Sequence, residues 1–141
     1  MGYVMTPSEA RVLIIDDEPD VAAMLVDSIE FLGYRVRAAH NGLDGTRMVE
    51  EFRPHVVLLD YLMPQMDGRH VLQFLKALHP ALPVVILSGT QDESVARALL
   101  NDGAWDFVPK PVDLGYLARV LAAATAGTAE RPQAERERRA S

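Results

Sequence analysis

The 141-residue chain contains no cysteine, which excludes disulfide bonds and thiolate metal ligands. The lack of cysteine fits a reducing compartment, and we expect a cytoplasmic protein. There is also no apolar run near the ~20 residues that a membrane-spanning helix needs, and no basic-then-apolar leader at Met1. The sequence therefore predicts neither membrane association nor secretion.

An excess of positive charge is missing as well. The chain carries 14 Lys and Arg against 20 Asp and Glu, a net charge of −6, which argues against direct nucleic-acid binding. No helix-turn-helix region is recognisable, so DNA binding by this chain is not expected. The apolar share of 49% and charged share of 24% are typical of a soluble globular protein, and the length suits one domain.

Short apolar runs mark the expected strands. Those near residues 11–15, 56–60 and 84–87 do not alternate with polar residues, which is typical of strands buried on both faces of a parallel sheet. Residues 34–39 do alternate, which predicts an edge strand with one polar face. Residues 105–108 form a last short strand.

Helical spacing separates these runs. Pro19 suits a first helical turn, and Gly33 supplies a stop for the helix between them. Further helices are expected up to Phe52, over residues 69–78, from residue 92 or 93 to Gly103, and over residues 114–124, with Met24 and Leu78 counted among the apolar positions. Five strand–helix repeats predict an α/β, flavodoxin-like (βα)5 three-layer sandwich with a parallel sheet of order 2-1-3-4-5.

The composition also suggests where the folded unit lies. Residues 1–10 show no period and are interpreted as a flexible N-terminal arm. Residues 11–125 form the expected globule. Residues 126–141 are Gly, Pro, Ala, Glu, Arg and Gln with almost nothing apolar, which is typical of a charged, disordered tail or of the start of a linker.

Chemically useful residues follow the central strands. Asp16 and Asp17 follow the first, Asp60 the third, Ser88 the fourth, and Lys110 the fifth. The carboxyl ends of parallel strands meet at one edge, so these side chains are expected to converge. Carboxylates ~4 Å apart repel by roughly 4 kcal/mol at an effective dielectric near 20, so a cation is needed among them, and oxygen ligands suit Mg²⁺.

These motifs resemble the receiver domain of bacterial two-component response regulators, including single-domain regulators of the chemotaxis type. The resemblance rests on the acids at 16–18, the run Asp60-Tyr61-Leu62-Met63-Pro64-Gln65-Met66-Asp67-Gly68, Ser88-Gly89, and the run from Gly103 to Pro111. It covers about residues 11–124, so the globule 11–125 is expected to be a receiver domain. It implies a phosphoprotein that is not an enzyme acting on an external substrate.

The resemblance implies a role for each matched residue. Asp60 would be the phosphoacceptor, and Asp17, Asp60 and the backbone carbonyl of Leu62 would bind Mg²⁺, with Asp16 helping through water. Ser88 and Lys110 would hold the phosphoryl oxygens.

The same resemblance implies a switch. Phe107 stands at the family's aromatic switch position and would move together with the Ser88 hydroxyl, and Lys110-Pro111 resembles the family's cis peptide. Leu62 and Thr90 would flank the phosphate. Because Leu62 cannot orient an attacking water through its side chain, we expect a long-lived phosphoryl group.

The implied partners are a sensor histidine kinase or phosphotransfer protein as donor, and an output partner that the sequence does not identify. Output, and a possible dimer, would use residues 95–124.

Three other functions were weighed. An FMN carrier of the flavodoxin type needs a hydroxyl- and glycine-rich loop where this chain has Asp-Asp-Glu-Pro. A phosphatase of the haloacid dehalogenase type needs an acid at position 62, where this chain has Leu. A degenerate receiver that only binds partners would not need the complete set of site residues found here. The set is Asp16, Asp17, Asp60, Ser88 and Lys110.

Simpler roles were preferred for other residues. The four histidines are interpreted as surface residues, Trp105 as rim packing, and Asp67-Gly68 as a turn with a helix cap. The residues concerned are His40, His55, His70 and His79.

Overall fold

Strands and helices alternate through the part of the chain that this computed structural model describes, residues 9–63, 67–89 and 93–127. The strands are β1 (Arg11–Ile15), β2 (Arg35–Ala39), β3 (Val56–Asp60), β4 (Val84–Ser88) and β5 (Asp106–Pro109). The helices are α1 (Pro19–Phe31), α2 (Gly42–Phe52), α3 (Gly68–Leu78), α4 (Glu93–Asn101) and α5 (Leu114–Thr125). The predicted order of elements is confirmed.

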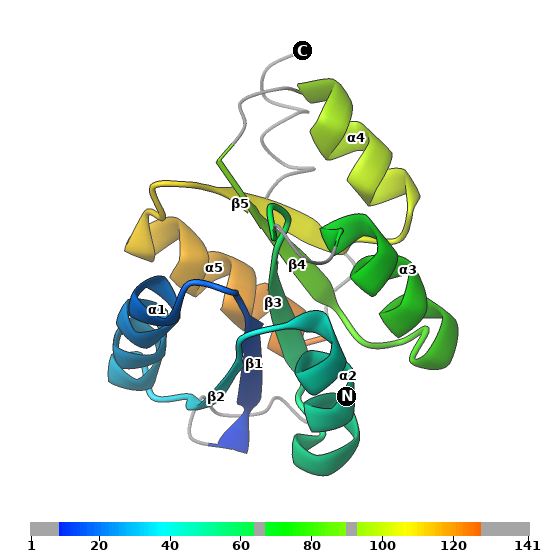
Figure 1. The fold of residues 1–141 in the computed structure, drawn as a ribbon. Helices are drawn as coiled ribbons and strands as arrows, with labels where there is room; N and C mark the ends of the chain where they lie inside the picture. The colour runs from blue at the N-terminus through cyan, green and yellow to red at the C-terminus, as the bar shows by residue number, and fades with distance from the viewer. Residues whose placement is uncertain (1–8, 64–66, 90–92, 128–141) are drawn as a thin grey trace.

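The five strands form one parallel sheet in the order β2-β1-β3-β4-β5 (Figure 1), which confirms the predicted fold class. The pairing of Ile14 with Leu58, and of Leu58 with Val85, puts three apolar runs side by side in the centre. Every residue of β3 and β4 is buried, as expected for runs without alternation.

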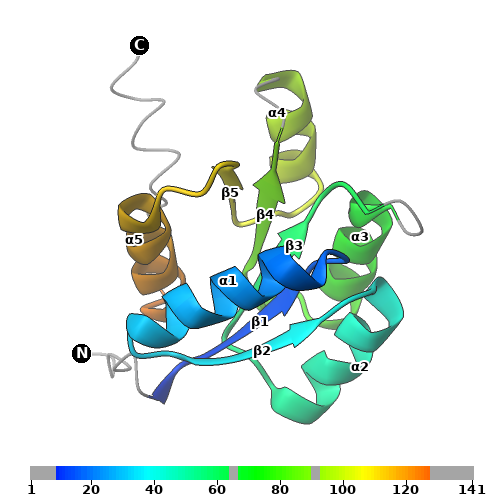
Figure 2. The same ribbon diagram turned by 60° about the vertical axis from the view of Figure 1, so that its left-hand side comes forward.

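Helices cover both faces of the sheet. Alternate residues of β1 and β3 point to opposite sides, so Ile14 and Leu58 pack with α1 and α5, while Leu13 and Leu59 pack with α2, α3 and α4. Figure 2 shows α1 and α5 on one side and the other three helices on the opposite side. The result is the expected three-layer sandwich, in which the helices cover both faces of the sheet.

The outermost strand β2 has the predicted polar face, with Arg35 and Arg37 exposed. Two apolar helix positions depart from expectation. Met24 is 70% exposed and Leu78 is 56% exposed, although their spacing placed them with the buried side chains. Met24 lies on the outer edge of the apolar stripe of α1, and Leu78 is the last residue of α3, where the helix has passed the sheet.

The folded body reaches one residue further than the sequence suggested. Ala10, assigned above to the N-terminal arm, is fully buried, and its carbonyl accepts the Arg35 N–H at 3.0 Å. The last helix ends at Thr125, next to the expected boundary. Residues 1–8 and 128–141, which make up most of the expected arm and tail, lie outside the described residues. Within the described ranges, none of the helices has the length and apolar character needed to cross a membrane.

Candidate functional site

The carboxyl ends of β1, β3 and β4 lie next to one another because these strands are neighbours in the sheet. Asp16 follows β1 directly, Asp60 ends β3 and Ser88 ends β4. All three side chains are buried: Asp16 is 0% exposed, Asp60 2% and Ser88 3%. Buried acids are rare without a partner, so this end of the sheet is a specialised site.

Lys110 brings a positive charge to these acids from just beyond β5. Its Nζ lies 3.2 Å from Asp60 Oδ1 and 3.8 Å from Asp16 Oδ2. Its backbone N–H donates to the Ser88 carbonyl at 2.7 Å, which extends the pairing of β4 with β5 past the end of the sheet. The Lys110-Pro111 peptide is cis, as the sequence suggested. One ammonium thus bridges two carboxylates that come from different strands.

The loop after β3 holds Asp60 in place from the other side. The Leu62 N–H donates to Asp60 Oδ1 at 3.3 Å, and the Tyr61 N–H donates to the Leu87 carbonyl at 2.9 Å. Gly68, at the start of α3, packs so closely that a Cβ there would lie 2.7 Å from the Tyr61 carbonyl oxygen. Asp67, as predicted, caps the helix and accepts the Arg69 N–H at 2.9 Å.

Burial raises the pKa of Asp60 above its ordinary value of 3.8, and the neighbouring Asp16 carboxylate raises the pKa further. The positive charge of Lys110, its hydrogen bond and that of the Leu62 N–H act in the opposite direction. Desolvation and like-charge repulsion dominate. The ionised form of Asp60 is therefore destabilised by its surroundings, and a further cation close to it would stabilise this form.

Among the described residues at this end, three carboxylate oxygens are buried without a hydrogen bond: Asp17 Oδ1, Asp60 Oδ2, and Asp16 Oδ2, which lies 3.8 Å from Lys110 Nζ. Buried acceptors are normally satisfied, so such a group usually marks a ligand or functional position. In addition, the carboxylates of Asp16, Asp17 and Glu18 offer oxygens within 4.8 Å of one another. The donor set is all oxygen and negatively charged, which suits a hard divalent cation.

Glu18 is a candidate ligand that the sequence analysis did not single out. It is the N-cap residue of α1, its side chain is exposed, and its N–H donates to Asp16 Oδ1 at 2.9 Å. An acid directly after an Asp pair was the available signal. An acid at a helix start also has an ordinary explanation in the helix dipole, so this signal is weak by itself.

The remaining predicted site residues lie at different distances from this centre. Phe107 is half-buried in β5, pairs with Ile86, and packs with the apolar cluster of α2, α3 and α4. The Leu62 side chain is 63% exposed, and its backbone N–H contacts Asp60. Thr90 lies outside the described residues. The structure thus brings together the side chains of Asp16, Asp60 and Lys110. Ser88 contacts this group through its backbone carbonyl, which accepts the Lys110 N–H.

Two of the four histidines, His55 and His79, are half-buried, and His55 differs most from its interpretation as a surface residue. His55 is half-buried, and its Nδ1 accepts the Arg11 N–H at 3.0 Å. Burial lowers the pKa of His55, and the nearby Arg11 charge lowers the pKa further, so both favour the neutral ring. This histidine joins the starts of β1 and β3, a long-range contact that local spacing does not reveal.

Comparison with known proteins gives one consistent result. A family model described as the response regulator receiver domain matches residues 12–122. The response regulator MprA of Mycobacterium ulcerans (strain Agy99) is 37% identical over 107 residues, which is 76% of this chain and 46% of that protein. The chain therefore spans about half the length of the curated relatives it matches.

Solved structures agree with the sequence relatives. The receiver domain of NtrX from Brucella abortus superposes with a TM-score of 0.77 at 29% identity, covering 81% of this chain and 97% of that one. A response regulator receiver domain protein from Clostridium thermocellum gives a TM-score of 0.72 at 30% identity, covering 82% of this chain and 90% of that one. Family and fold are thus indicated independently by sequence and by structure.

Proposed function

This chain belongs to the response regulator receiver family, and we propose that it accepts a phosphoryl group on Asp60 and signals through the conformational change that follows. The observation that carries the proposal is the meeting of Asp60, Asp16 and Lys110 at one buried point, with Lys110 Nζ in contact with both acids. No simple structural role needs two buried acids and a lysine from three separate strand ends.

The proposed step is a phosphoryl transfer. An oxygen of the Asp60 carboxylate attacks the phosphorus of a phosphorylated donor, a P–O bond forms, and the bond from phosphorus to the donor atom breaks. With a phosphohistidine donor, the released imidazole nitrogen keeps the electron pair and takes a proton from water. The product is an acyl phosphate on Asp60. The protein in this proposal catalyses only its own modification and has no external substrate.

A divalent cation fits the acids beside Asp60, and Mg²⁺ is the one we propose. Asp17, Asp60 and the Leu62 carbonyl are the residues proposed to hold it directly, with Asp16 helping through water; Asp17 Oδ1 and Asp60 Oδ2 are buried and accept no hydrogen bond. The exposed Glu18 carboxylate, within 4.8 Å of the Asp16 and Asp17 oxygens, widens this set. When bound, Mg²⁺ would neutralise the negative charge shared by the acids and the incoming phosphoryl oxygens.

Lys110 and Ser88 are proposed to hold the phosphoryl oxygens. The Lys110 ammonium already touches the Asp60 carboxylate, so it can follow the new negative charge with little movement. Ser88 ends the strand next to Asp60, and its hydroxyl is the proposed link to Phe107. Movement of Phe107 would change the face formed by residues 95–124, the proposed output and dimer face.

The donor is proposed to be a histidine kinase or phosphotransfer protein in the cytoplasm. Next to Lys110 lies a groove of ≈ 300 Å³ between α1 and α5, lined largely by apolar side chains. Met24, 70% exposed, and Leu114, 40% exposed, both line it. These side chains offer a protein donor an apolar contact beside the reacting group, which a small phosphodonor does not need.

Intact-mass measurement tests the central proposal. Wild type incubated with acetyl phosphate and Mg²⁺ should gain the mass of one phosphoryl group, and Asp60→Asn should gain none. A matched control is Asp67→Asn, because Asp67 is an exposed acid on the same loop and should not alter the gain. Modification of the Asp60→Asn variant would exclude Asp60 as the acceptor.

A second measurement separates the donor surface from the chemistry. Met24→Glu should slow transfer from a phosphorylated protein donor by about tenfold, the effect of losing one contact of ~1.4 kcal/mol. It should leave the rate with acetyl phosphate unchanged. Equal slowing with both donors would show that Met24 acts on the site itself rather than on donor docking.

A further inference from the structure

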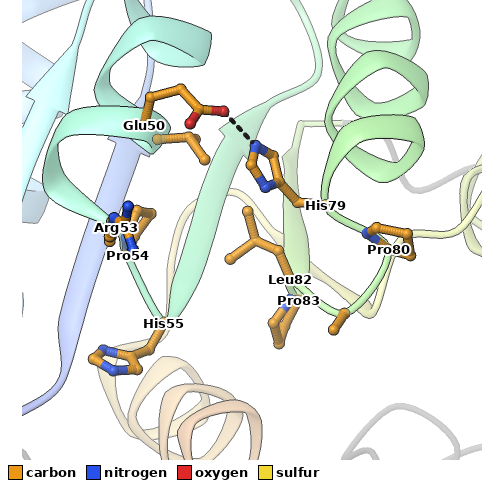
Figure 3. Close-up of a pocket in the computed structure, with 10 residues that line it drawn as sticks. Glu50, Arg53, Pro54, His55, His79, Pro80, Leu82 and Pro83 are labelled. Atoms are coloured by element: carbon orange, nitrogen blue, oxygen red, sulfur yellow. Dashed lines mark hydrogen bonds and ion pairs between the residues drawn. The ribbon is translucent and has the colours of Figure 1, made fainter.

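A second groove lies at the amino ends of β3 and β4, at the opposite end of the sheet from Asp60. It has a volume of ≈ 580 Å³. The C-terminal part of α2 and the following Pro54 and His55 form one side, and residues 79–83, between α3 and β4, form the other (Figure 3). We refer to it as the amino-end groove. The proposed phosphoryl chemistry does not use it.

The two sides of the amino-end groove are held in place by specific contacts. Glu50 Oε1 and His79 Nε2 lie 3.0 Å apart and join α2 to the opposite wall, as Figure 3 shows. Lys76 Nζ donates to the Pro80 and Leu82 carbonyls at 2.7 and 2.8 Å. The Val57 N–H donates to the Pro83 carbonyl at 3.0 Å. The groove is therefore preformed, which lowers the ordering cost of filling it.

The lining favours an apolar occupant. Val49 and Leu82 supply aliphatic side chains, and three of the lining residues are prolines, which have no backbone N–H to donate. The polar lining residues are Glu50, Arg53, His55 and His79. Glu50 is already paired with His79, and the His55 ring already accepts the Arg11 N–H. Burying apolar side chains here would gain about 25 cal/mol per Å² of surface removed from water. The three prolines are Pro54, Pro80 and Pro83.

We propose that the amino-end groove is the docking site of this chain's own residues 1–8, with Tyr3, Val4 and Met5 as the apolar side chains that fill it. The described chain begins at Glu9, and Arg11 is tied to the groove wall. The Arg11 N–H donates to His55 Nδ1 at 3.0 Å, and the His55 N–H donates to the Arg11 carbonyl at 2.8 Å. Arg11 Nε also donates to the Arg53 carbonyl at 2.9 Å.

The reach of the segment agrees with this site. The strand order places β1 next to β3 and two positions from β4, a lateral distance of about 10 Å at the usual strand spacing. Residues 1–8 can span up to about 26 Å when extended, at ~3.3 Å per residue. Met5 and Tyr3 precede Glu9 by distances of about 13 and 20 Å on the same scale. The apolar residues therefore fall at the right separation.

The other end of the chain is a poorer match. Residues 128–141 follow α5, which packs on the opposite face of the sheet from α2 and α3. Their sequence is Thr, Ala, Pro, Gln, Ser and charged residues, without a large apolar side chain. They have little to gain in a proline- and leucine-lined groove. The segment at the start of the chain has both the proximity and the side chains.

A spin label tests the proposal in the full-length chain. Because the natural sequence has no cysteine, Thr6→Cys can be labelled at one position. The label should broaden the NMR signals of the Leu82 methyls and the His79 ring, and leave those of Leu117, on the opposite face, unchanged. Combining it with Tyr3→Ser, Val4→Ser and Met5→Ser should abolish the broadening, since the docked apolar side chains are then removed.

Two further samples test whether the C-terminal residues or a second copy of the chain occupies the amino-end groove instead. A label at Ser141→Cys should have no effect on Leu82 or His79. Mixing spin-labelled chains without isotopes with isotope-enriched chains without a label should also give no broadening. Broadening from the Ser141→Cys label, broadening only in the mixed sample, or no broadening from the Thr6→Cys label would each overturn the proposal.

Discussion

Lys110 Nζ and Asp60 Oδ1 lie 3.2 Å apart, although 50 positions separate the two residues in the chain. The contact exists because β3 and β5 both end at the same edge of the sheet, with β4 between them. Lys110 also reaches Asp16 at 3.8 Å, so the lysine partly neutralises two buried acids at once. The balance between this single cation and the acids around it determines how the site responds to pH, to metal and to mutation.

The pH dependence of stability should change when Asp60 is replaced. Its raised pKa means that the folded protein keeps a proton on Asp60 at pH values where the unfolded chain has lost it. Ionising Asp60 therefore destabilises the fold as the pH rises from about 3.8 through the folded-state pKa. In EDTA at pH 7, Asp60→Asn should raise the free energy of unfolding by about 1 kcal/mol. Denaturant titrations at several pH values should show the gain disappearing in acid.

Removing Lys110 should have the opposite effect on stability. Among the described residues, Lys110→Met leaves the Leu62 N–H as the one hydrogen-bond donor to Asp60 Oδ1 and removes the ion-pair partner of Asp16. At pH 7 without metal, we expect a loss of about 1–3 kcal/mol, the usual result of leaving a buried charge unpaired. The same change should tighten Mg²⁺ binding, because a competing cation is removed. Calorimetry showing weaker Mg²⁺ binding by Lys110→Met would contradict the proposed placement of the metal.

Mg²⁺ should stabilise the wild type by binding the buried carboxylate oxygens that accept no hydrogen bond. A ligand present at ten times its dissociation constant adds about 1.4 kcal/mol to the free energy of unfolding. Asp17→Asn removes one of the unpartnered oxygens and should abolish most of this gain in a thermal melt. Asp20→Asn is the matched control, since Asp20 is an exposed acid in the first turn of α1. Equal losses in both variants would indicate general electrostatics rather than a site.

The lifetime of the phosphoryl group should depend on residue 62. The Leu62 N–H contacts Asp60, yet the side chain is 63% exposed and apolar, so it cannot orient water toward an acyl phosphate. Leu62→Asn should speed hydrolysis about tenfold, less than the ~100-fold of a fully positioned catalytic group, because an exposed side chain at this position has few contacts to hold it in place. Mass spectrometry after removal of the donor measures the decay. Leu62→Met should keep the wild-type lifetime.

The glycine that starts α3 should be intolerant of a side chain. A Cβ on Gly68 would lie 2.7 Å from the Tyr61 carbonyl oxygen and 3.1 Å from that of Asp60, and backbone atoms cannot rotate away. Gly68→Ala should lower the free energy of unfolding by about 1–3 kcal/mol and displace the loop that carries Asp60. Gly89→Ala, which meets nothing within 4 Å, should change it by less than about 0.5 kcal/mol. Circular dichroism melts of both variants make the comparison.

The apolar runs in the sequence were sufficient to predict the sheet. The composition of a run such as residues 56–60 predicts its burial, because a strand covered on both faces needs apolar side chains at almost every position. Strand order followed from the exposed face of β2 and from the rules for parallel connections. The strand order also predicted that Asp16, Asp60 and Lys110 lie close together, and in the structure Lys110 Nζ lies 3.8 Å from Asp16 and 3.2 Å from Asp60.

Other features depend on contacts between residues far apart in the chain, which no local pattern encodes. Spacing placed Met24 in the apolar stripe of α1, but the position of α5 and the sheet leaves it 70% exposed. The sequence around His55 is that of an ordinary loop histidine. Its role depends on the hydrogen bond from the Arg11 N–H, and Arg11 is 44 positions away in the chain.

The sequence by itself determined which residues follow the central strands. Because the carboxyl ends of parallel strands share one edge of the sheet, it also determined that these residues lie at the same edge. Only the tertiary structure decided which carboxylate oxygens lost water without gaining a hydrogen bond, and in which direction the pKa of Asp60 moved. Both depend on ångström-scale distances and on burial, which are set by the packing of the whole chain.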